Sequence, residues 1–245
     1  MAHGYTADYE QNELKNFPEY LPEGSTVYMT KPYTFWTCSF LPGSLLALLE
    51  RSVKFPKSLP IPRPLRPEFP AQLLSLCQSW CEPLRQNALR SNTHDLGFMT
   101  QPLRMDWELT GNLNSLESVK KAAYNLASRF NECTGAIRSW NVAKSRSYNI
   151  TDMQDNFLVI VDSMANLDLL YYVGNHTGDR ELIEKASSHA RAVKRTLVRA
   201  DYSTYHVVNL TPATGEIQHR FTHQGYNDDS CWSRYGFEHQ VHGAS

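Results

Sequence analysis

Apolar residues recur every three or four positions through several long segments of this chain, which is the spacing of one buried face of an α-helix. Some of these segments are apolar on one side only, whereas the segment from about 153 to 173 is apolar nearly all round. Such a mixture predicts two layers, in which outer helices cover inner ones. An α/α toroid of helical hairpins fits the pattern, and a plain helical bundle fits it almost as well. The predicted helices begin near Pro42 and cover about residues 73–80, 113–130, 153–173 and 179–199.

Two other segments break the helical pattern. Residues 202–222 read YSTYHVVNL and EIQHRFT on either side of TPATG, which predicts a short β-hairpin. Six prolines between residues 54 and 70 exclude both a helix and a central strand, so we expect an extended surface connection there. The aromatic, proline-containing opening of the chain, residues 1–34, predicts an irregular lead-in.

The composition excludes several classes of protein. With 24 Lys and Arg against 25 Asp and Glu, the chain of 245 residues has no basic excess to neutralise a nucleic-acid backbone. No stretch approaches the roughly 18 apolar residues that a membrane helix requires. The first residues, MAHGYTADYE, lack the features of a secretory signal, so we expect a cytoplasmic protein without a membrane or nucleic-acid partner.

The cysteines do not form a recognisable disulfide framework or metal motif. The chain has five cysteines, and only Cys77 and Cys81 lie one helical turn apart. We expect this pair to be small buried residues. The sequence contains no HExxH motif and no Gly-rich phosphate loop, and therefore predicts no metal and no cofactor.

Asp162 is the most unusual single residue, because it lies in the apolar segment FLVIVDSMANLDLL. Burial disfavours the charged form of a carboxyl group, which suits a carboxylic acid that donates a proton near neutral pH. The alternative is a structural aspartate that forms a hydrogen bond with a neighbouring loop or with Asn166, one turn later.

Two polar segments also contain candidate site residues. In SNTHDLGF, His94 and Asp95 lie side by side, although a turn in which Asp95 caps the next element would explain the pattern without any catalysis. The segment 222–234, THQGYNDDSCWSR, concentrates aromatic, amide and charged residues of the kind that line sites for sugars and carboxylates. A solvated surface loop is the alternative for this segment.

These segments resemble the unsaturated glucuronyl hydrolases, glycoside hydrolase family 88. The similar segments are, in order, FWTCSFLPGSL, SNTHDLGFM, GAIRSW, VDSMANLDLLYY, DYSTYHVV and THQGYNDDSCWSR. The resemblance implies an all-α fold, an (α/α)6 toroid of helical hairpins, with the short hairpin near residues 202–222. It also implies an enzyme that releases a Δ4,5-unsaturated glucuronic acid from the non-reducing end of oligosaccharides left by polysaccharide lyases.

The resemblance also implies roles for particular residues. Asp162 resembles the acid that protonates C4 of the vinyl ether and helps water to add at C5, after which the hemiketal collapses. Asp95 resembles the second aspartate, which orients substrate or water. The residues that resemble the lining of the sugar pocket are Trp36, His94, Trp140, His206, His223, Gln224, Trp232 and Arg234. No cofactor is implied, and the expected partner is the unsaturated oligosaccharide.

The resemblance ends near residue 234. The family continues there with a Gly-Gln-Ala-Trp run and further helices, whereas this chain reads RYGFEHQVHGAS. We therefore expect an incomplete toroid over residues 35–234 and a divergent tail over residues 235–245. Two other functions fit the sequence: an unsaturated rhamnogalacturonyl hydrolase, and a truncated protein that binds uronates without turning them over. The oligomeric state is not predicted.

Overall fold

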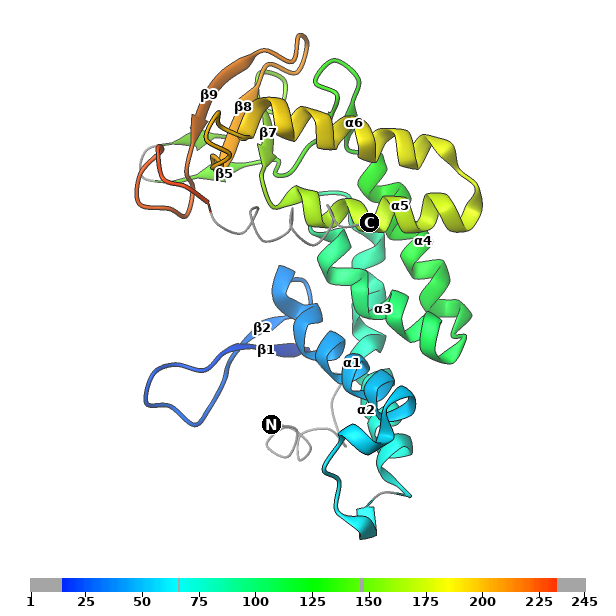
Figure 1. Cartoon of the computed structure of the whole chain (residues 1–245). Helices are drawn as coiled ribbons and strands as arrows, with labels where there is room; N and C mark the ends of the chain where they lie inside the picture. The colour runs from blue at the N-terminus through cyan, green and yellow to red at the C-terminus, as the bar shows by residue number, and fades with distance from the viewer. Residues whose placement is uncertain (1–14, 66, 146–147, 233–245) are drawn as a thin grey trace. The chain divides into compact units, whose positions relative to one another are not determined.

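Figure 1 shows the computed structural model of the chain, which describes residues 15–65, 67–145 and 148–232. The chain divides into two compact units. The first comprises Met1–Leu89 and Phe98–Lys121, and the second comprises Arg90–Gly97 and Ala122–Ser245. The domain boundaries predicted at residues 34 and 234 stay predictions.

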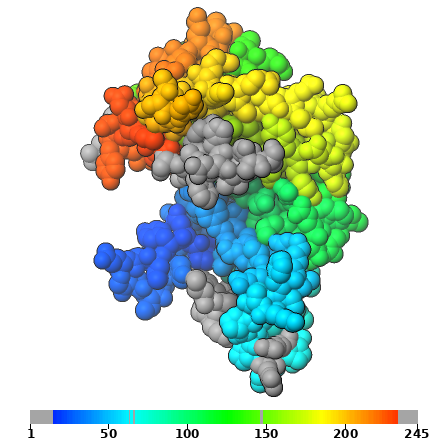
Figure 2. Space-filling model, viewed as in Figure 1, coloured from blue at the N-terminus to red at the C-terminus, as the bar shows by residue number. Residues whose placement is uncertain are grey.

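The first unit contains an antiparallel hairpin of β1 (Asn16–Tyr20) and β2 (Met29–Pro32), in a segment where the sequence indicated irregular structure. Phe17 of β1 is buried, and its ring meets that of Trp80 edge-on, with 5.1 Å between the centroids. The hairpin is tied to its unit by this contact. Tyr20 and Met29 are exposed, and Figure 2 shows the hairpin in dark blue.

Four helices begin or lie in the first unit, and three of them match the predicted ones. The helices are α1 (Phe40–Lys54), α2 (Phe69–Cys81), α3 (Leu96–Thr110) and α4 (Leu113–Ala127), of which α3 and α4 contribute residues to both units. Short 3-10 turns link them: η2 (Trp36–Ser39), η3 (Pro56–Ser58), η4 (Arg63–Leu65) and η5 (Glu82–Leu89). From Phe55 to Glu68 the described part of the proline-rich segment lacks α-helix and strand, as predicted, whereas Pro70 lies in the first turn of α2. Cys77 and Cys81 are buried.

A buried carboxylate fixes the turn between α3 and α4. Asp106 is 1% exposed and accepts hydrogen bonds from Ser115 Oγ at 2.5 Å and from Asn112 Nδ2 at 2.8 Å. The Thr110 hydroxyl donates a third bond, at 3.2 Å. A buried charge requires such donors, so Asp106 stabilises the start of α4 through them.

The second unit contains a three-stranded antiparallel sheet in the order β7-β8-β9. Its strands are β7 (Phe157–Ile160), β8 (Val207–Leu210) and β9 (Ile217–Phe221). The pair β8 and β9 confirms the predicted hairpin. Four further strands of two residues each form two small hairpins: β3 (Phe130–Asn131) with β4 (Ala136–Ile137), and β5 (Ala143–Lys144) with β6 (Asn149–Ile150).

The helix predicted from about residue 153 to 173 is wrong over its first part, because β7 occupies residues 157–160. Alternate residues of β7 enter two different hydrophobic clusters. Phe157 and Val159 face the cluster with α6, whereas Leu158 and Ile160 face the cluster with Phe221. Both faces are therefore buried, and the strand is an unbroken apolar run without the polar alternation of a half-exposed strand.

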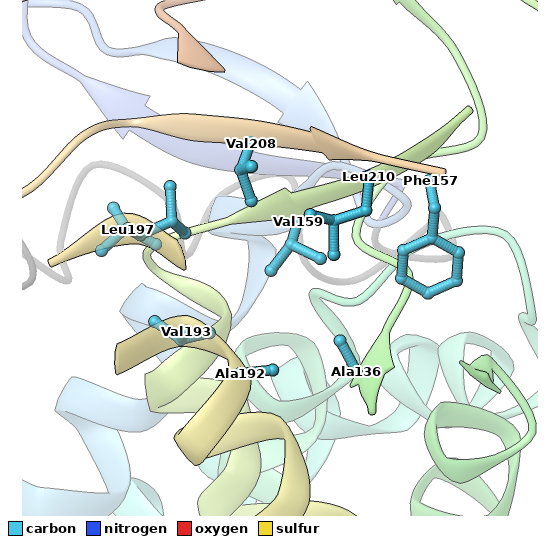
Figure 3. Packing of buried hydrophobic residues seen from close by; sticks show 9 residues of the cluster. Ala136, Phe157, Val159, Ala192, Val193, Leu197, Val208 and Leu210 are labelled. Atoms are coloured by element: carbon cyan, nitrogen blue, oxygen red, sulfur yellow. The ribbon is translucent and has the colours of Figure 1, made fainter. Parts of the chain in front are cut away.

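Two helices, α5 (Ser163–Thr177) and α6 (Arg180–Leu197), follow the strand. Asp179 caps α6 as its sequence indicates, because its carboxylate accepts the Glu181 amide at 3.0 Å. Figure 3 shows the buried stripe of α6 packed against β7 and β8. Gly174 permits the close approach of the two helices, since a Cβ there would lie 2.7 Å from Ile183 Cγ1.

Ser139 covers the outer edge of β7. Its amide donates to the Leu158 carbonyl at 2.8 Å, and its hydroxyl accepts the Ile160 amide at 2.9 Å. Backbone groups of an edge strand that would otherwise need water are thus satisfied by one residue.

Among the described residues, no helix is long and apolar enough to cross a membrane.

Candidate active site

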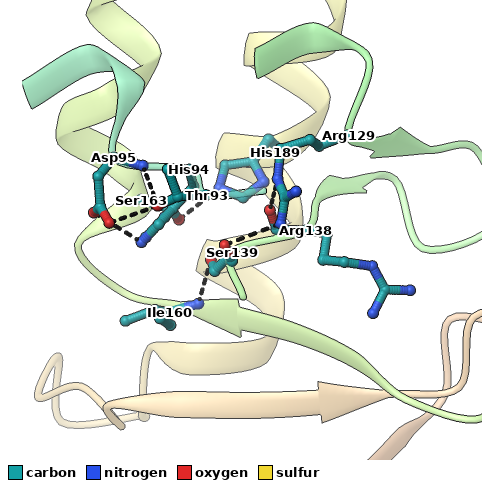
Figure 4. Close-up of polar contacts among 9 residues, drawn as sticks. All are labelled: Thr93, His94, Asp95, Arg129, Arg138, Ser139, Ile160, Ser163 and His189. Carbon is teal, nitrogen blue, oxygen red and sulfur yellow. Dashed lines mark hydrogen bonds and ion pairs between the residues drawn. The ribbon is translucent and has the colours of Figure 1, made fainter. Parts of the chain in front are cut away.

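The turn that precedes α3 orients His94 and Asp95. Thr93 Oγ1 donates to Asp95 Oδ2 at 2.6 Å, and His94 Nε2 lies 3.2 Å from Asp95 Oδ1 (Figure 4). The Asp95 amide in turn donates to Thr93 Oγ1 at 3.1 Å. Both carboxylate oxygens therefore have a neighbour within the turn, and His94 is 2% exposed.

The polypeptide around Ser139 supports this turn. The His94 amide donates to the Ser139 carbonyl at 3.2 Å, and Thr93 forms an isolated β-bridge with Trp140. Because Ser139 also binds β7, this residue connects the turn to the sheet. The predicted pocket residues His94 and Trp140 thus lie on two backbone segments that pair with each other.

Arg129 strengthens the same connection, although the sequence analysis did not single it out. Its guanidinium donates to the Arg138 carbonyl at 2.8 Å, the Ser139 carbonyl at 3.1 Å and Asn141 Oδ1 at 2.9 Å, and also to the Ser91 carbonyl. Burial, and next the charge of Arg138, lower the pKa of Arg129 to about 10, while Asp95 acts in the opposite direction. Arg129 therefore keeps its positive charge at neutral pH.

Asp162 lies where β7 ends and α5 begins, and it is 8% exposed. The preceding amide, that of Val161, donates to the His206 carbonyl at 3.0 Å and so continues the pairing of β7 with β8. The side chain of Asp162 is at the N-cap position of α5 but forms no capping hydrogen bond with the helix. The sequence prediction that this carboxyl group lies in a dry environment agrees with its burial.

Close packing at Gly97 brings the Asp95 turn to the first turn of α5. A Cβ at residue 97 would lie 2.6 Å from Asn166 Cα and 2.9 Å from the Asn166 carbonyl oxygen. Only glycine allows the two backbones to approach so closely. Asp95 lies two residues before Gly97, and Asp162 lies one turn before Asn166, so the two candidate acids stand on segments in direct contact.

Four of the predicted pocket residues form an aromatic group. The ring of His206 stacks on that of Trp232, with 3.8 Å between centroids and 7° between planes. Trp140 meets His206 edge-on at 6.4 Å and His223 at 5.1 Å. Flat apolar faces beside polar ring atoms are typical of sites that bind sugars.

Hydrogen bonds determine how the two histidines of this group are presented. The His223 amide donates to His206 Nδ1 at 3.3 Å, and Thr222 Oγ1 lies 3.0 Å from the same nitrogen. Because a backbone amide only donates, Nδ1 of His206 is an acceptor and the proton of the neutral ring is on Nε2. Burial lowers the pKa of His223, which favours its neutral form.

The loop after β9 is held by Asp228, another residue that the sequence analysis did not assign. Asp228 Oδ1 accepts the Thr222 amide at 2.9 Å, and Oδ2 accepts the Tyr148 hydroxyl at 2.5 Å. This bond to Asp228 raises the pKa of Tyr148 to about 12. The loop that carries His223 is thereby tied to the β5–β6 hairpin.

Three of the predicted pocket residues remain. Gln224 is exposed in the loop after β9. Trp36 lies in the first unit, where its ring is 5.5 Å from that of Phe40 and 6.1 Å from that of Phe98. Arg234 lies outside the described residues. Within the described ranges, no group of three or more His, Cys, Asp or Glu side chains could hold a metal ion.

Comparison with curated proteins shows several relatives, whereas no family model matches the chain. The chain is 34% identical over 143 residues to the unsaturated chondroitin disaccharide hydrolase of Streptococcus pneumoniae, a match that covers 58% of this chain and 34% of that protein. It is 28% identical over 227 residues to the unsaturated glucuronyl hydrolase of Formosa agariphila, which covers 89% of this chain and 49% of that protein.

Solved structures show the same relationship. An unsaturated glucuronyl hydrolase specific for heparin matches 94% of this chain and 55% of its own, with a TM-score of 0.76 and 28% identity. The enzyme of Bacillus sp. GL1 matches 90% of this chain and 53% of its own, with a TM-score of 0.70 and 26% identity.

These matches confirm the predicted fold class, a mostly helical chain of the toroid type with a few short strands. The chain spans about a third to half of the length of the first curated relatives and about half of the length of the solved structures. Sequence and fold together show that the chain is similar to the unsaturated glucuronyl hydrolases, over most of its own length and part of theirs.

Proposed function

We propose that this protein is a glycoside hydrolase that removes a Δ4,5-unsaturated glucuronic acid from the non-reducing end of oligosaccharides produced by polysaccharide lyases. The observation that carries the proposal is the buried carboxyl group of Asp162 on a segment in contact with the turn of His94 and Asp95. The names of the curated relatives, which act on unsaturated glucuronyl or chondroitin substrates, support this substrate class.

In the proposed reaction, the carboxylic acid of Asp162 transfers its proton to C4 of the enol ether. Positive charge then develops at C5 and the ring oxygen, and water adds to C5 as its proton returns to the Asp162 carboxylate. The hemiketal that results opens to a ketone as the bond between C5 and the ring oxygen breaks. The hemiacetal thereby formed at C1 then expels the next sugar as an alcohol and becomes an aldehyde. A carboxyl group with little water around it is suited to protonating carbon, because the dry environment disfavours its charged form.

The other residues receive supporting roles in the same proposal. Asp95, oriented by Thr93 and His94, positions the water or a substrate hydroxyl. Trp140, Trp232 and His206 provide the flat walls against which the sugar lies. His223 and Gln224, which lie in the same unit as these walls, are further proposed lining residues of the sugar pocket.

The decisive experiment measures loss of the ultraviolet absorbance of the conjugated C4=C5 bond with an unsaturated chondroitin disaccharide. We expect turnover by the parent protein and none by Asp162→Asn. Asp168→Asn is the matched control, because it makes the same chemical change on the same helix and should keep the activity. Turnover by Asp162→Asn at the parental rate would remove the assignment of the acid.

A comparison of two unsaturated disaccharides, one from chondroitin and one from pectin, also separates the two alternative functions. Faster turnover of an unsaturated pectin-derived disaccharide than of the chondroitin disaccharide would favour a rhamnogalacturonyl hydrolase. Binding of either compound without loss of absorbance would favour a uronate-binding protein that lacks catalysis.

A further inference from the structure

His189 is a completely buried histidine on α6 whose two ring nitrogens both have partners on other elements. The Ile137 amide, in β4, donates to Nδ1 at 2.8 Å. Nε2 lies 2.7 Å from the hydroxyl oxygen of Ser163, the first residue of α5 (Figure 4). The imidazole thus connects α6 with the small hairpin on one side and with the start of α5 on the other.

The partners determine the protonation of this ring. A backbone amide donates only, so Nδ1 must accept and carry no proton. Burial, and next the charge of His94, lower the pKa of His189 to about 3. The ring is therefore neutral at physiological pH with its proton on Nε2, and this proton is donated to the Ser163 hydroxyl oxygen.

The bond reaches α5 at the first residue of the helix. Ser163 is 2% exposed and directly follows Asp162. The first backbone bonds of the helix are long: the Met164 amide lies 3.4 Å from the Val161 carbonyl, and the Ala165 amide lies 3.2 Å from the Asp162 carbonyl. Asp162 itself does not cap the helix. The short bond from His189 is thus a strong fixed link at this end of α5.

We propose that His189 is a positioning residue for the acid: its neutral ring, fixed by the Ile137 amide, holds Ser163 and thereby fixes the orientation of the adjacent Asp162 carboxyl group. This inference rests on the proposed function for the role of Asp162. The competing possibility is a buried histidine that only stabilises the packing of α6.

Two substitutions at position 189 separate these possibilities. In His189→Asn the amide oxygen can occupy the place of Nδ1 and accept the Ile137 amide, but the side chain is too short to reach Ser163. In His189→Gln the longer side chain can reach Ser163 with its amide. Ser188→Ala is the matched control, because it removes a bond of 3.0 Å from α6 to the Gly135 carbonyl without touching α5.

The absorbance assay gives the first readout. We expect His189→Asn and Ser163→Ala to lower kcat by about tenfold to a hundredfold, since a small displacement of a catalytic group has effects of this size. KM should change by less than about twofold, because the residues that bind the sugar are intact. His189→Gln should recover part of kcat, and Ser188→Ala should retain it. Equal kcat in His189→Asn and the parent would overturn the proposal.

A second readout does not depend on turnover. Amide hydrogen exchange over residues 162–166 should be faster in His189→Asn than in Ser188→Ala, although both variants lose one bond from α6. If the parent protein does not consume the disaccharide, the proposed function fails, and the exchange data still decide whether His189 fixes this turn. Unchanged exchange in His189→Asn would refute the positioning role in either case.

Discussion

Replacement of Gly97 by alanine tests the contact on which the arrangement of the two candidate acids depends. The new Cβ would lie 2.6 Å from Asn166 Cα, 2.7 Å from Asn166 Oδ1 and 2.9 Å from the Asn166 carbonyl oxygen. Ordinary contact begins near 3.4 Å, so the two backbones must separate by about 0.8 Å. Two of the three atoms belong to the backbone of α5, which cannot rotate away as the end of a side chain would.

The expected cost follows from this overlap. Overpacking of this kind lowers the free energy of unfolding by about 1–3 kcal/mol, whereas alanine in place of a helical glycine restores at most about 1 kcal/mol. Each net kcal/mol corresponds to a fall in melting temperature of roughly 2–4 °C for a chain of this size. The same displacement moves Asp95 relative to Asp162, and we expect kcat to fall by about a hundredfold.

Gly43→Ala is the matched control, because a Cβ there meets only Pro102 Cγ, at 3.9 Å. Alanine in α1 should leave the stability unchanged or raise it by up to about 1 kcal/mol. Thermal unfolding and the absorbance assay are measured on both variants under identical conditions. If Gly97→Ala is as stable and as active as Gly43→Ala, the close approach of the turn to α5 is refuted.

Three further predictions concern other buried groups. Asp106→Ala should lower the free energy of unfolding by about 3 kcal/mol in urea titrations, because its buried donors lose a charged acceptor; a smaller loss than in Ser115→Ala would contradict this. The pKa of His189 is depressed in the folded protein, so its contribution to stability is complete above the unfolded value, near 6.5, and is lost as the pH falls toward the folded value of about 3. Between these two pH values the free energy of unfolding should therefore fall less steeply in His189→Gln than in the parent protein. Identical pH profiles of the two proteins would disprove that His189 has a depressed pKa. A thiol reagent should react quickly with the exposed Cys133 and Cys231 and only on unfolding with the three buried cysteines, because burial raises the pKa of the Cys77 thiol to about 12; fast reaction of more than two thiols in the folded protein would count against it.

The parts of the fold that the sequence predicted are those with a one-sided pattern. In α6 the apolar stripe, the Asp179 cap and the basic last turn all indicate the same helix, and the structure has it. In β7 no such pattern exists, because clusters on both faces bury every residue of the strand. A continuous apolar run fits a buried strand and a buried helix equally well, so only the packing distinguishes them.

The candidate site was predictable where unusual residues cluster in short segments, as at His94 and Asp95. The sequence does not indicate the supporting residues, because each of them binds a partner far away in the sequence. Arg129 binds Ser91, and Asp228 binds Tyr148. His189 did leave one signal. It falls on the apolar stripe of α6 between Ala186 and Val193, where a polar ring requires buried partners.

The attachment of Ser139 to the edge of β7 has a consequence for local unfolding. Its amide and hydroxyl satisfy the outward backbone groups of Leu158 and Ile160, while its carbonyl accepts the amide of His94. Fraying of that strand would therefore also loosen one support of the turn of His94 and Asp95, because Ser139 binds both. We therefore expect the edge of the sheet and the turn of His94 and Asp95 to open together, as a single cooperative unit.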